Sequence, residues 1–295
     1  MTPAPDRGLA RLAQGAAAPN PRAKALPVHC DATCPIGIFD SGVGGLTVAR
    51  AVMDRLPNER IVYFGDTARV PYGVKSPDTV ARYAAQITRF LLAKNVKLLI
   101  VACNTMAAVA LPAIASISPV PVIEVISAGA KSALAVSKSR RIGIIATPST
   151  VASRAYEKAL ELYGGPGVHA VSKACPLFVP LVEEGWLDHP ATRMVAEEYL
   201  RPMLAEDLDT LILGCTHYPL LAPLLAQVVG PQVRLQDSAT AMAARAAAVL
   251  AELNLARNDG PPRHIFHVTD MPLRFREIGE RFLGRPMEDV RLEKM

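Results

Sequence analysis

Two stretches of sequence decide the fold: LLIVACNT at positions 98–105 and TLILGCTH at positions 210–217. Each is an apolar run with the length and β-branched content of a buried strand, and each closes on a small residue, a cysteine and polar residues. Because ligands of parallel α/β sheets bind at the carboxyl ends of strands, the sequence predicts one thiol at each of two such ends. Two facing thiols suit a reaction that removes a proton from one side of a carbon and returns one to the other.

The composition limits the class of protein. A length of 295 residues suggests about two domains, and an apolar share of 51% supports large cores. Aromatic residues make up only 5% and the net charge of +5 comes from scattered Lys and Arg, so we expect no nucleic acid and no membrane as partners. No apolar run approaches the ~20 residues that span a bilayer. The five cysteines do not suggest a disulfide framework, which favours a cytoplasmic location.

Residues 1–35 are rich in Ala, Pro and Arg without a periodic apolar face, which predicts a disordered amino-terminal tail. The tail has no serine and no long apolar core, so a targeting peptide is disfavoured. Its segment HCDATC, positions 29–34, offers metal ligands, but structural zinc sites usually need four and no second pair stands nearby. We therefore predict no metal site, and we keep open a regulatory or interaction role for the tail.

A glycine-rich turn, DSGVGGLT at positions 40–47, follows the first predicted strand, residues 36–39, and opens a helix that runs to about residue 56. Turns of this type present backbone N–H groups to an anion. The turn matches neither the dinucleotide fingerprint nor the P-loop, because Thr47 occupies its last position and no Gly-Lys-Ser/Thr follows. We expect it to face a carboxylate ligand, with Asp40 and Ser41 at the strand tip.

The rest of the chain alternates between strands and helices, which predicts an α/β fold. Predicted strands cover residues 61–65, 98–102, 120–124, 141–146, 168–173, 210–214, 233–236 and 265–268; predicted helices cover residues 76–94, 105–117, 127–136, 191–205, 219–229, 238–253 and 272–283. Residues 141–146 have the pattern of the first strand of a second unit. We therefore place the crossing between two domains near residues 129–139.

The predicted chemistry rests on the two thiols. Inverting an amino acid at Cα without a cofactor needs a base on one face and an acid on the other. A free thiol, with a pKa of about 8.5, serves as either, so the resting site needs one thiolate and one thiol. His217 stands two residues after Cys215, and Asp40 at another strand end can assist Cys103. Groups for a substrate carboxylate or ammonium come from Asn104, Thr105 and Thr216.

Three other interpretations stay open on the residues alone. A cysteine that ends an apolar strand is often a small core residue without chemistry. Cys215 and His217 also suit a nucleophile that forms a thioester, a hypothesis that leaves Cys103 without a role. A cleft of this kind also suits a binding module that holds an acidic amino acid without turning it over. The variant Cys103→Ser separates the two enzymes, because a thioester hydrolase can survive it and a two-base racemase cannot.

Four motifs in this order resemble those of glutamate racemases: FDSGVGGLT at positions 39–47, GDTARVPYG at 65–73, CNT at 103–105 and GCTHYP at 214–219. The resemblance runs from about residue 36 to the carboxyl end. It implies an α/β fold of two pseudo-symmetric, doubly wound parallel-sheet domains with the active site in the cleft between them. It also implies cofactor-independent interconversion of L- and D-glutamate, which supplies D-glutamate for peptidoglycan. Homodimers are common in the family.

By position, the resemblance implies that Cys103 and Cys215 are the two proton donors and acceptors, that Asp40 and His217 assist them, and that Glu183 is a further helper. The implied substrate contacts are Asp40, Ser41, Tyr72, Gly73, Asn104, Thr105, Thr216 and His217. No cofactor and no metal are implied.

The resemblance also implies where the domain boundaries lie. It implies one domain of residues 36–130 together with 237–295 and a second of residues 131–236, with the crossing back near residues 236–238. Two features depart from the family pattern. Residues 1–35 lie outside it, and Met106 and Ala107 stand where relatives usually carry Ala and then Ser or Thr. Aspartate racemase shares the two-cysteine plan, but the full set of motifs favours glutamate.

Overall fold

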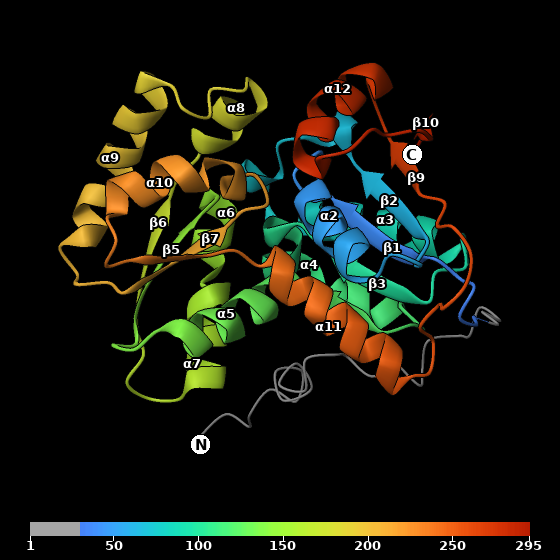
Figure 1. The fold of residues 1–295 in the computed structure, drawn as a ribbon, viewed down its shortest axis with the longest axis horizontal. Helices are drawn as coiled ribbons and strands as arrows, with labels where there is room; N and C mark the ends of the chain where they lie inside the picture. Colours follow the sequence, from blue (N-terminus) through green and yellow to red (C-terminus); the bar gives the residue numbers. More distant parts are fainter. Residues whose placement is uncertain (1–29) are drawn as a thin grey trace.

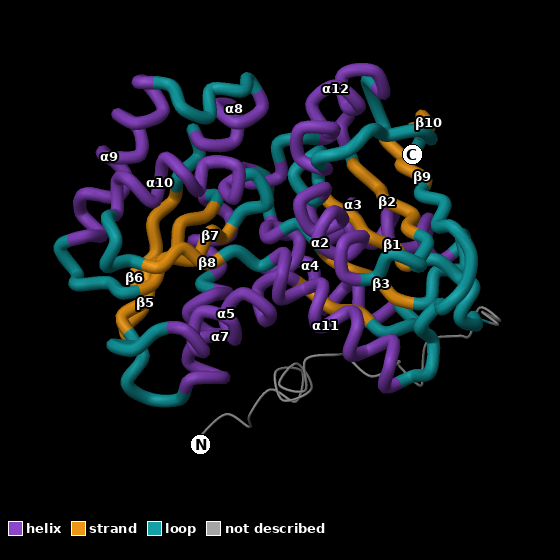
Figure 2. Tube along the Cα trace, viewed as in Figure 1, coloured by secondary structure: helices purple, strands orange, loops and turns teal. Residues whose placement is uncertain are grey.

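The computed structural model describes residues 30–295, and over these residues ten strands form two sheets. Figure 1 shows the two sheets next to each other, each surrounded by helices, and Figure 2 shows the strands as an inner layer under the helices. The molecule therefore has two α/β domains, which confirms the predicted fold class. Residues 1–29 of the predicted tail, including His29 of the metal hypothesis, lie outside the described residues.

The first sheet has the strand order β10-β9-β2-β1-β3-β4, and all of its neighbouring pairs are parallel. Its domain contains β1 (Ile36–Asp40), α2 (Leu46–Arg55), β2 (Ile61–Gly65), the short 3-10 helices η1 (Thr67–Arg69) and η2 (Tyr72–Val74), α3 (Pro77–Leu92), β3 (Leu98–Val101), α4 (Asn104–Ile117), β4 (Val122–Glu124), α11 (Ala239–Glu252), β9 (Ile265–Val268), α12 (Pro272–Leu283) and β10 (Val290–Leu292).

The second sheet has the order β6-β5-β7-β8 and is also parallel throughout. Its elements are α5 (Val125–Val136), β5 (Arg141–Ala146), α6 (Pro148–Ser153), α7 (Ala155–Gly164), β6 (His169–Ala174), α8 (Phe178–Glu183), α9 (Pro190–Leu204), β7 (Thr210–Gly214), the 3-10 helix η3 (Tyr218–Leu221), α10 (Ala222–Val229) and β8 (Arg234–Gln236).

The central strands read as continuous apolar runs because helices cover both faces of each sheet. Every residue of β1, β2, β3 and β7 is buried. Local signals start the helices between them. Ser76 caps α3 by accepting from the backbone of Thr79, with Pro77 in the first helical position. Glu124 caps α5 with its carboxylate, which accepts from the backbone N–H groups of Ile126 and Ser127.

The chain crosses between the sheets twice. After β4 it enters α5, which packs against α7 and β7 of the second sheet. After β8 it returns through residues 237–238 into α11, which packs against α2 of the first domain. The helices that follow the two crossings, α5 and α11, also contact each other. The two crossings therefore lie close together in space, although more than a hundred residues separate them.

Residues 30–35, which the sequence assigned to the disordered tail, instead form a turn held against the first domain. The buried Lys97 ammonium lies 2.7 Å from a carboxylate oxygen of Glu59 and donates to the backbone oxygen of Ala32 at 2.8 Å. The thiol of Cys30 donates to the backbone oxygen of Asn95 at 3.2 Å. A buried ammonium must satisfy its donors, and the partner that orders this segment is distant in sequence. Composition alone does not reveal it.

The strand order of each sheet reverses beside its first strand. β1 lies between β2 and β3, and β5 lies between β6 and β7. At such switch points the loops leaving neighbouring strands diverge and open a crevice at the carboxyl ends. Cys103 follows β3 and Cys215 follows β7, so each thiol stands at the switch point of its own sheet.

Candidate active site

A cavity of about 380 Å³ lies where the two switch points meet, and both Cys103 and Cys215 line it. This volume suits a small-molecule ligand. One wall is apolar and comes from Val70, Pro71, Val74, Pro176, Val179 and Pro180. The other predicted site residues that line the cavity are Ser41, Tyr72, Gly73, Asn104, Thr105, Glu183, Thr216 and His217. Among the described residues that line it, none is Lys or Arg.

Cys103 lies between the end of β3 and the start of α4. Its thiol donates to the Ser41 hydroxyl, with the sulfur 3.7 Å from Oγ. Burial and the neighbouring Asp40 carboxylate together raise the pKa of Cys103 to about 12, although backbone N–H and Ser41 contacts oppose this. This cysteine therefore holds its proton in the resting site.

Asp40 ends β1 and is completely buried beneath the cavity rather than in its lining. One carboxylate oxygen, Oδ2, accepts from the Gly42 backbone N–H at 2.9 Å, while Oδ1 has no hydrogen-bond partner within residues 30–295. Burial raises the pKa of Asp40, and the charge of His217 and the backbone donors lower it. The charge of Asp40 raises the pKa of Cys103, although Asp40 is not part of the cavity lining.

Cys215, His217 and Glu183 form a hydrogen-bonded line. The sulfur of Cys215 lies 3.9 Å from Nδ1 of His217, and Nε2 of His217 lies 2.9 Å from Oε1 of Glu183. Burial lowers the pKa of His217, but the partners Cys215 and Glu183 outweigh it and raise this pKa to about 10. His217 is therefore an imidazolium at neutral pH, and its positive charge faces the second sulfur.

The glycine-rich turn also makes a close contact with the second domain. The Gly42 N–H is already used by Asp40. A Cβ atom on Gly44 would overlap both the Thr216 hydroxyl and the His217 ring, so this glycine lets the turn approach the second domain closely. The turn therefore packs against the segment that carries Cys215. Its residues Ser41 and Gly42 also line the cavity, so a carboxylate ligand at this turn stays a prediction.

Tyr72 and Gly73 enter the cavity from the loop after β2. The Tyr72 hydroxyl donates to the buried carboxylate of Asp66, which also accepts from Thr269 at 2.8 Å. Burial and the Asp66 charge raise the pKa of Tyr72, so the hydroxyl stays protonated. A Cβ atom on Gly73 would lie 2.7 Å from Cβ of Thr147, so glycine is needed for this loop to touch the second domain.

Sequence reasoning missed Thr147, which lines the cavity at the end of β5. Its hydroxyl lies 3.0 Å from that of Thr105 in the first domain and 3.0 Å from that of Thr150 at the start of α6. A signal existed, because Thr147 follows the first strand of the second sheet just as Asp40 and Ser41 end the first strand of the first. Tyr156 was also missed; its hydroxyl donates to Oδ1 of Asn104 at 2.7 Å.

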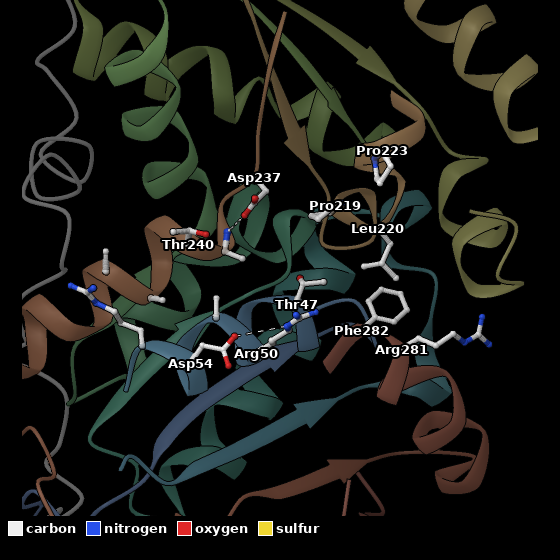
Figure 3. Close-up of a pocket in the computed structure, with 15 residues that line it drawn as sticks. Thr47, Arg50, Asp54, Pro219, Leu220, Pro223, Asp237, Thr240, Arg281 and Phe282 are labelled. Carbon is white, nitrogen blue, oxygen red and sulfur yellow. Dashed lines mark hydrogen bonds and ion pairs between the residues drawn. The ribbon is translucent and has the colours of Figure 1, made fainter. Parts of the chain in front are cut away.

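A second cavity, of about 750 Å³, has Thr47, Pro219 and Phe282 in its lining. Figure 3 shows the residues that line it. Thr47 on α2 donates to the backbone oxygen of Thr216 at 3.2 Å, and the Phe282 ring of α12 meets the His217 ring edge-on at 5.2 Å. These contacts hold Thr216 and His217 against the first domain.

Two further observations concern other classes of protein. Throughout residues 30–295, no helix combines the length and apolar character needed to cross a membrane. The same part of the chain contains no group of three or more His, Cys, Asp and Glu side chains arranged to hold a metal ion. The cavity that both cysteines line is the feature on which a functional assignment rests.

Fold and site define a class of protein: a two-domain parallel α/β protein with two cysteines in the lining of one cavity of small-molecule size. The family model described as Asp/Glu/Hydantoin racemase matches residues 46–246. The chain is 60% identical over 257 residues to a glutamate racemase of Syntrophus aciditrophicus (strain SB), covering 87% of this chain and 95% of that one. It is 54% identical over 260 residues to a glutamate racemase of Neisseria meningitidis serogroup A, covering 88% and 96%.

Among solved structures, glutamate racemase from Francisella tularensis subsp. tularensis SCHU S4 in complex with D-glutamate is similar, with a TM-score of 0.84 and 40% identity over 89% of this chain and 98% of that one. The chain belongs to the Asp/Glu/Hydantoin racemase family and, within it, to the glutamate racemases. It is therefore an amino-acid racemase, an isomerase.

Proposed function

We propose that this protein interconverts L- and D-glutamate without a cofactor, by passing the Cα proton between Cys103 and Cys215. The observation that carries the proposal is that both thiols line one cavity although they come from different sheets. Relatives over nearly the whole described chain are glutamate racemases, and one of them is solved with D-glutamate. These likenesses support glutamate as the substrate.

The two thiols have opposite surroundings, which suits a resting site with one acid and one base. Burial and Asp40 keep Cys103 protonated. Cys215 faces the His217 imidazolium, whose charge stabilises a thiolate. In this proposal Asp40 is the helper of Cys103, and His217 with Glu183 is the helper of Cys215.

In one direction, the Cys215 thiolate takes the Cα proton on its side of the substrate. The electron pair of the broken C–H bond moves to Cα and its carboxylate. Cys103 then gives its thiol proton to the opposite side of Cα, which forms the new C–H bond and leaves a Cys103 thiolate. The resting state returns when a proton passes from Cys215 to Cys103 through solvent, and the reverse direction exchanges the two roles.

The substrate contacts follow from the chemistry of the lining. The hydroxyls of Ser41, Thr105, Thr147 and Thr216 and the Asn104 amide are neutral donors for the substrate carboxylates. The amino end of α4, which starts at Asn104, adds the positive end of a helix dipole beside Cys103. Tyr72 and Gly73 complete this set, while Asp40 acts from below the lining.

The alternative of a thioester-forming nucleophile has a specific observation in its favour, because Cys215, His217 and Glu183 lie in line as a nucleophile, a base and an orienting acid would. It leaves unexplained why Cys103 faces the same cavity. Membership of a racemase family also argues against it. The two-thiol reaction accounts for both cysteines.

We also propose the context that the resemblance implies. The domains are residues 36–130 with 237–295, and residues 131–236; the strand composition of the two sheets supports this division. The product D-glutamate serves peptidoglycan synthesis, the enzyme works in the cytoplasm, and two chains form a homodimer. Light scattering of the purified full chain tests the dimer.

The decisive experiment incubates the purified chain with L-glutamate in D₂O, without pyridoxal phosphate, and follows optical rotation and deuterium at Cα. We expect both to change in the parent chain and neither to change in Cys103→Ser or Cys215→Ser. A folded parent chain that binds glutamate without exchange would be a binding module instead. Exchange with aspartate at an equal rate would contradict the substrate assignment.

A further inference from the structure

The side-chain amide of Asn104 can face the cavity with either its oxygen or its NH₂ group. Asn104 follows Cys103 directly, starts α4 and lines the cavity. Its amide carries an acceptor oxygen on one side and a donor NH₂ group on the other. A cavity for a dicarboxylate without Lys or Arg in its lining needs the donor, since the oxygen would repel the substrate. Some group must therefore hold the Asn104 oxygen away from the ligand.

Tyr156 is that group. It lies on α7 of the second domain, is 1% exposed, and its hydroxyl donates to Oδ1 of Asn104 at 2.7 Å. The Ser238 hydroxyl, at the crossing back to the first domain, lies 3.4 Å from the Tyr156 oxygen. Because the Tyr156 hydroxyl has a single proton and gives it to Asn104, Ser238 is the donor in the second contact. The hydrogen bonds thus run in one direction, from Ser238 to Tyr156 to Asn104.

Two glycines leave room for the Tyr156 side chain to pack closely. A Cβ atom on Gly214 would lie 3.0 Å from Cε2 of Tyr156, so the ring packs directly against the strand residue that precedes Cys215. A Cβ atom on Gly129 would lie 2.6 Å from the Ser238 hydroxyl and 3.3 Å from the Tyr156 hydroxyl. One buried side chain therefore contacts the neighbours of both thiols in sequence, Asn104 after Cys103 and Gly214 before Cys215.

We propose that Tyr156 is a positioning residue across the two domains: its hydroxyl holds the Asn104 oxygen so that the amide NH₂ group faces the cavity and donates to a substrate carboxylate. The inference rests on the proposed function, because it takes glutamate as the ligand. Tyr156 does not line the cavity, so its effect on the substrate passes through Asn104.

The test begins with Tyr156→Phe, which removes only the hydroxyl. The Asn104 amide is then free to turn its oxygen toward the substrate. We expect the KM for glutamate to rise about tenfold, as for one lost hydrogen bond with a carboxylate, and kcat to change by less than about threefold. The matched control is Tyr163→Phe on the same helix, whose hydroxyl donates to Ser127 at 3.1 Å and does not line the cavity; its KM should not change.

A double-mutant cycle with Asn104→Ala separates positioning from packing. If Tyr156 acts through Asn104, then Tyr156→Phe has no further effect on KM once the amide is gone. A KM for Tyr156→Phe equal to that of the parent chain would overturn the proposal. An equal effect of Tyr156→Phe with and without the Asn104 amide would overturn it too.

Should Tyr156→Phe not fold, the isosteric variant Asn104→Asp decides the orientation. An NH₂ group that faces a carboxylate becomes a repelling oxygen, so we expect glutamate to bind about a hundredfold more weakly than to the parent chain. Equally tight binding of Asn104→Asp would show that the oxygen faces the ligand, and the proposal would fall. Calorimetric titration with glutamate provides this readout.

If the parent chain binds glutamate without racemising it, the proposed reaction fails while the orientation of Asn104 is still measured.

Discussion

His217 lies between a sulfur and a carboxylate: its Nδ1 atom is 3.9 Å from Sγ of Cys215 and its Nε2 atom is 2.9 Å from Oε1 of Glu183. Glu183 comes from α8, and Cys215 and His217 come from the end of β7, so the arrangement exists only in the folded second domain. Both partners favour the charged imidazole, which explains why its pKa is raised to about 10 despite burial.

Glu183→Gln should move the pH dependence of the reaction. The pKa of His217 is raised above its ordinary value to about 10. The imidazolium is therefore fully present at pH values below the ordinary pKa, and it is lost as the pH rises through about 10. Without the Glu183 charge this pKa falls, and we expect the alkaline limb of kcat/KM to move to lower pH and kcat near neutral pH to fall about tenfold. The neighbour Glu184, whose side chain is 65% exposed, gives the control Glu184→Gln. An alkaline limb that stays in place would contradict the role of Glu183.

Cys103→Ser and Cys215→Ser should each abolish racemisation, with kcat lower by about 10³-fold, because a serine hydroxyl is a far weaker acid than a thiol and hardly ionises near neutral pH to give a base. Polarimetry measures this loss. Cys34→Ser is the control, since Cys34 lies outside the cavity. Full thioester hydrolysis by Cys103→Ser would favour the alternative reaction.

Thr147→Val keeps the shape of the side chain and removes a hydroxyl that contacts Thr105 at 3.0 Å. Because this contact joins the domains beside Cys103, we expect kcat/KM for glutamate to fall about tenfold, as for a lost hydrogen bond. Thr240→Val, at an exposed helical position that lines the second cavity, is the matched control. Equal kinetics of the two variants would remove Thr147 from the site.

Lys97→Met should lower stability without changing the chemistry. The variant leaves the Glu59 carboxylate buried and unpaired and frees the backbone oxygens of Ala32 and Leu255. We expect the free energy of unfolding to fall by about 3–5 kcal/mol, measured by urea denaturation. Arg201→Met breaks an ion pair whose side chains are 74% and 71% exposed, and it should have no measurable effect. Similar losses in both variants would show that burial of the Lys97–Glu59 pair is not the cause.

The apolar strands and their terminal cysteines were predictable, because a strand buried on both faces must be apolar along its whole length. The same local patterns placed most helices, as Ser76 and Pro77 do at α3. The turn at residues 30–35 was not predictable, since the donors of Lys97 that order it lie far along the chain. The packing of the glycine-rich turn was not predictable, because its close neighbours, Thr216 and His217, belong to the other domain.

The sequence by itself determined the parallel α/β class, the two units and the pair of thiols at strand ends, because these depend on periodicity and on residues adjacent in the chain. Only the tertiary structure decided that Asp40 lies beneath the cavity, that Thr147 completes its lining, and that Tyr156 holds Asn104 from the second domain. The reason is physical. The charge of His217 and the orientation of an amide are set by groups within a few ångströms, and folding brings those groups together from positions that no local pattern connects.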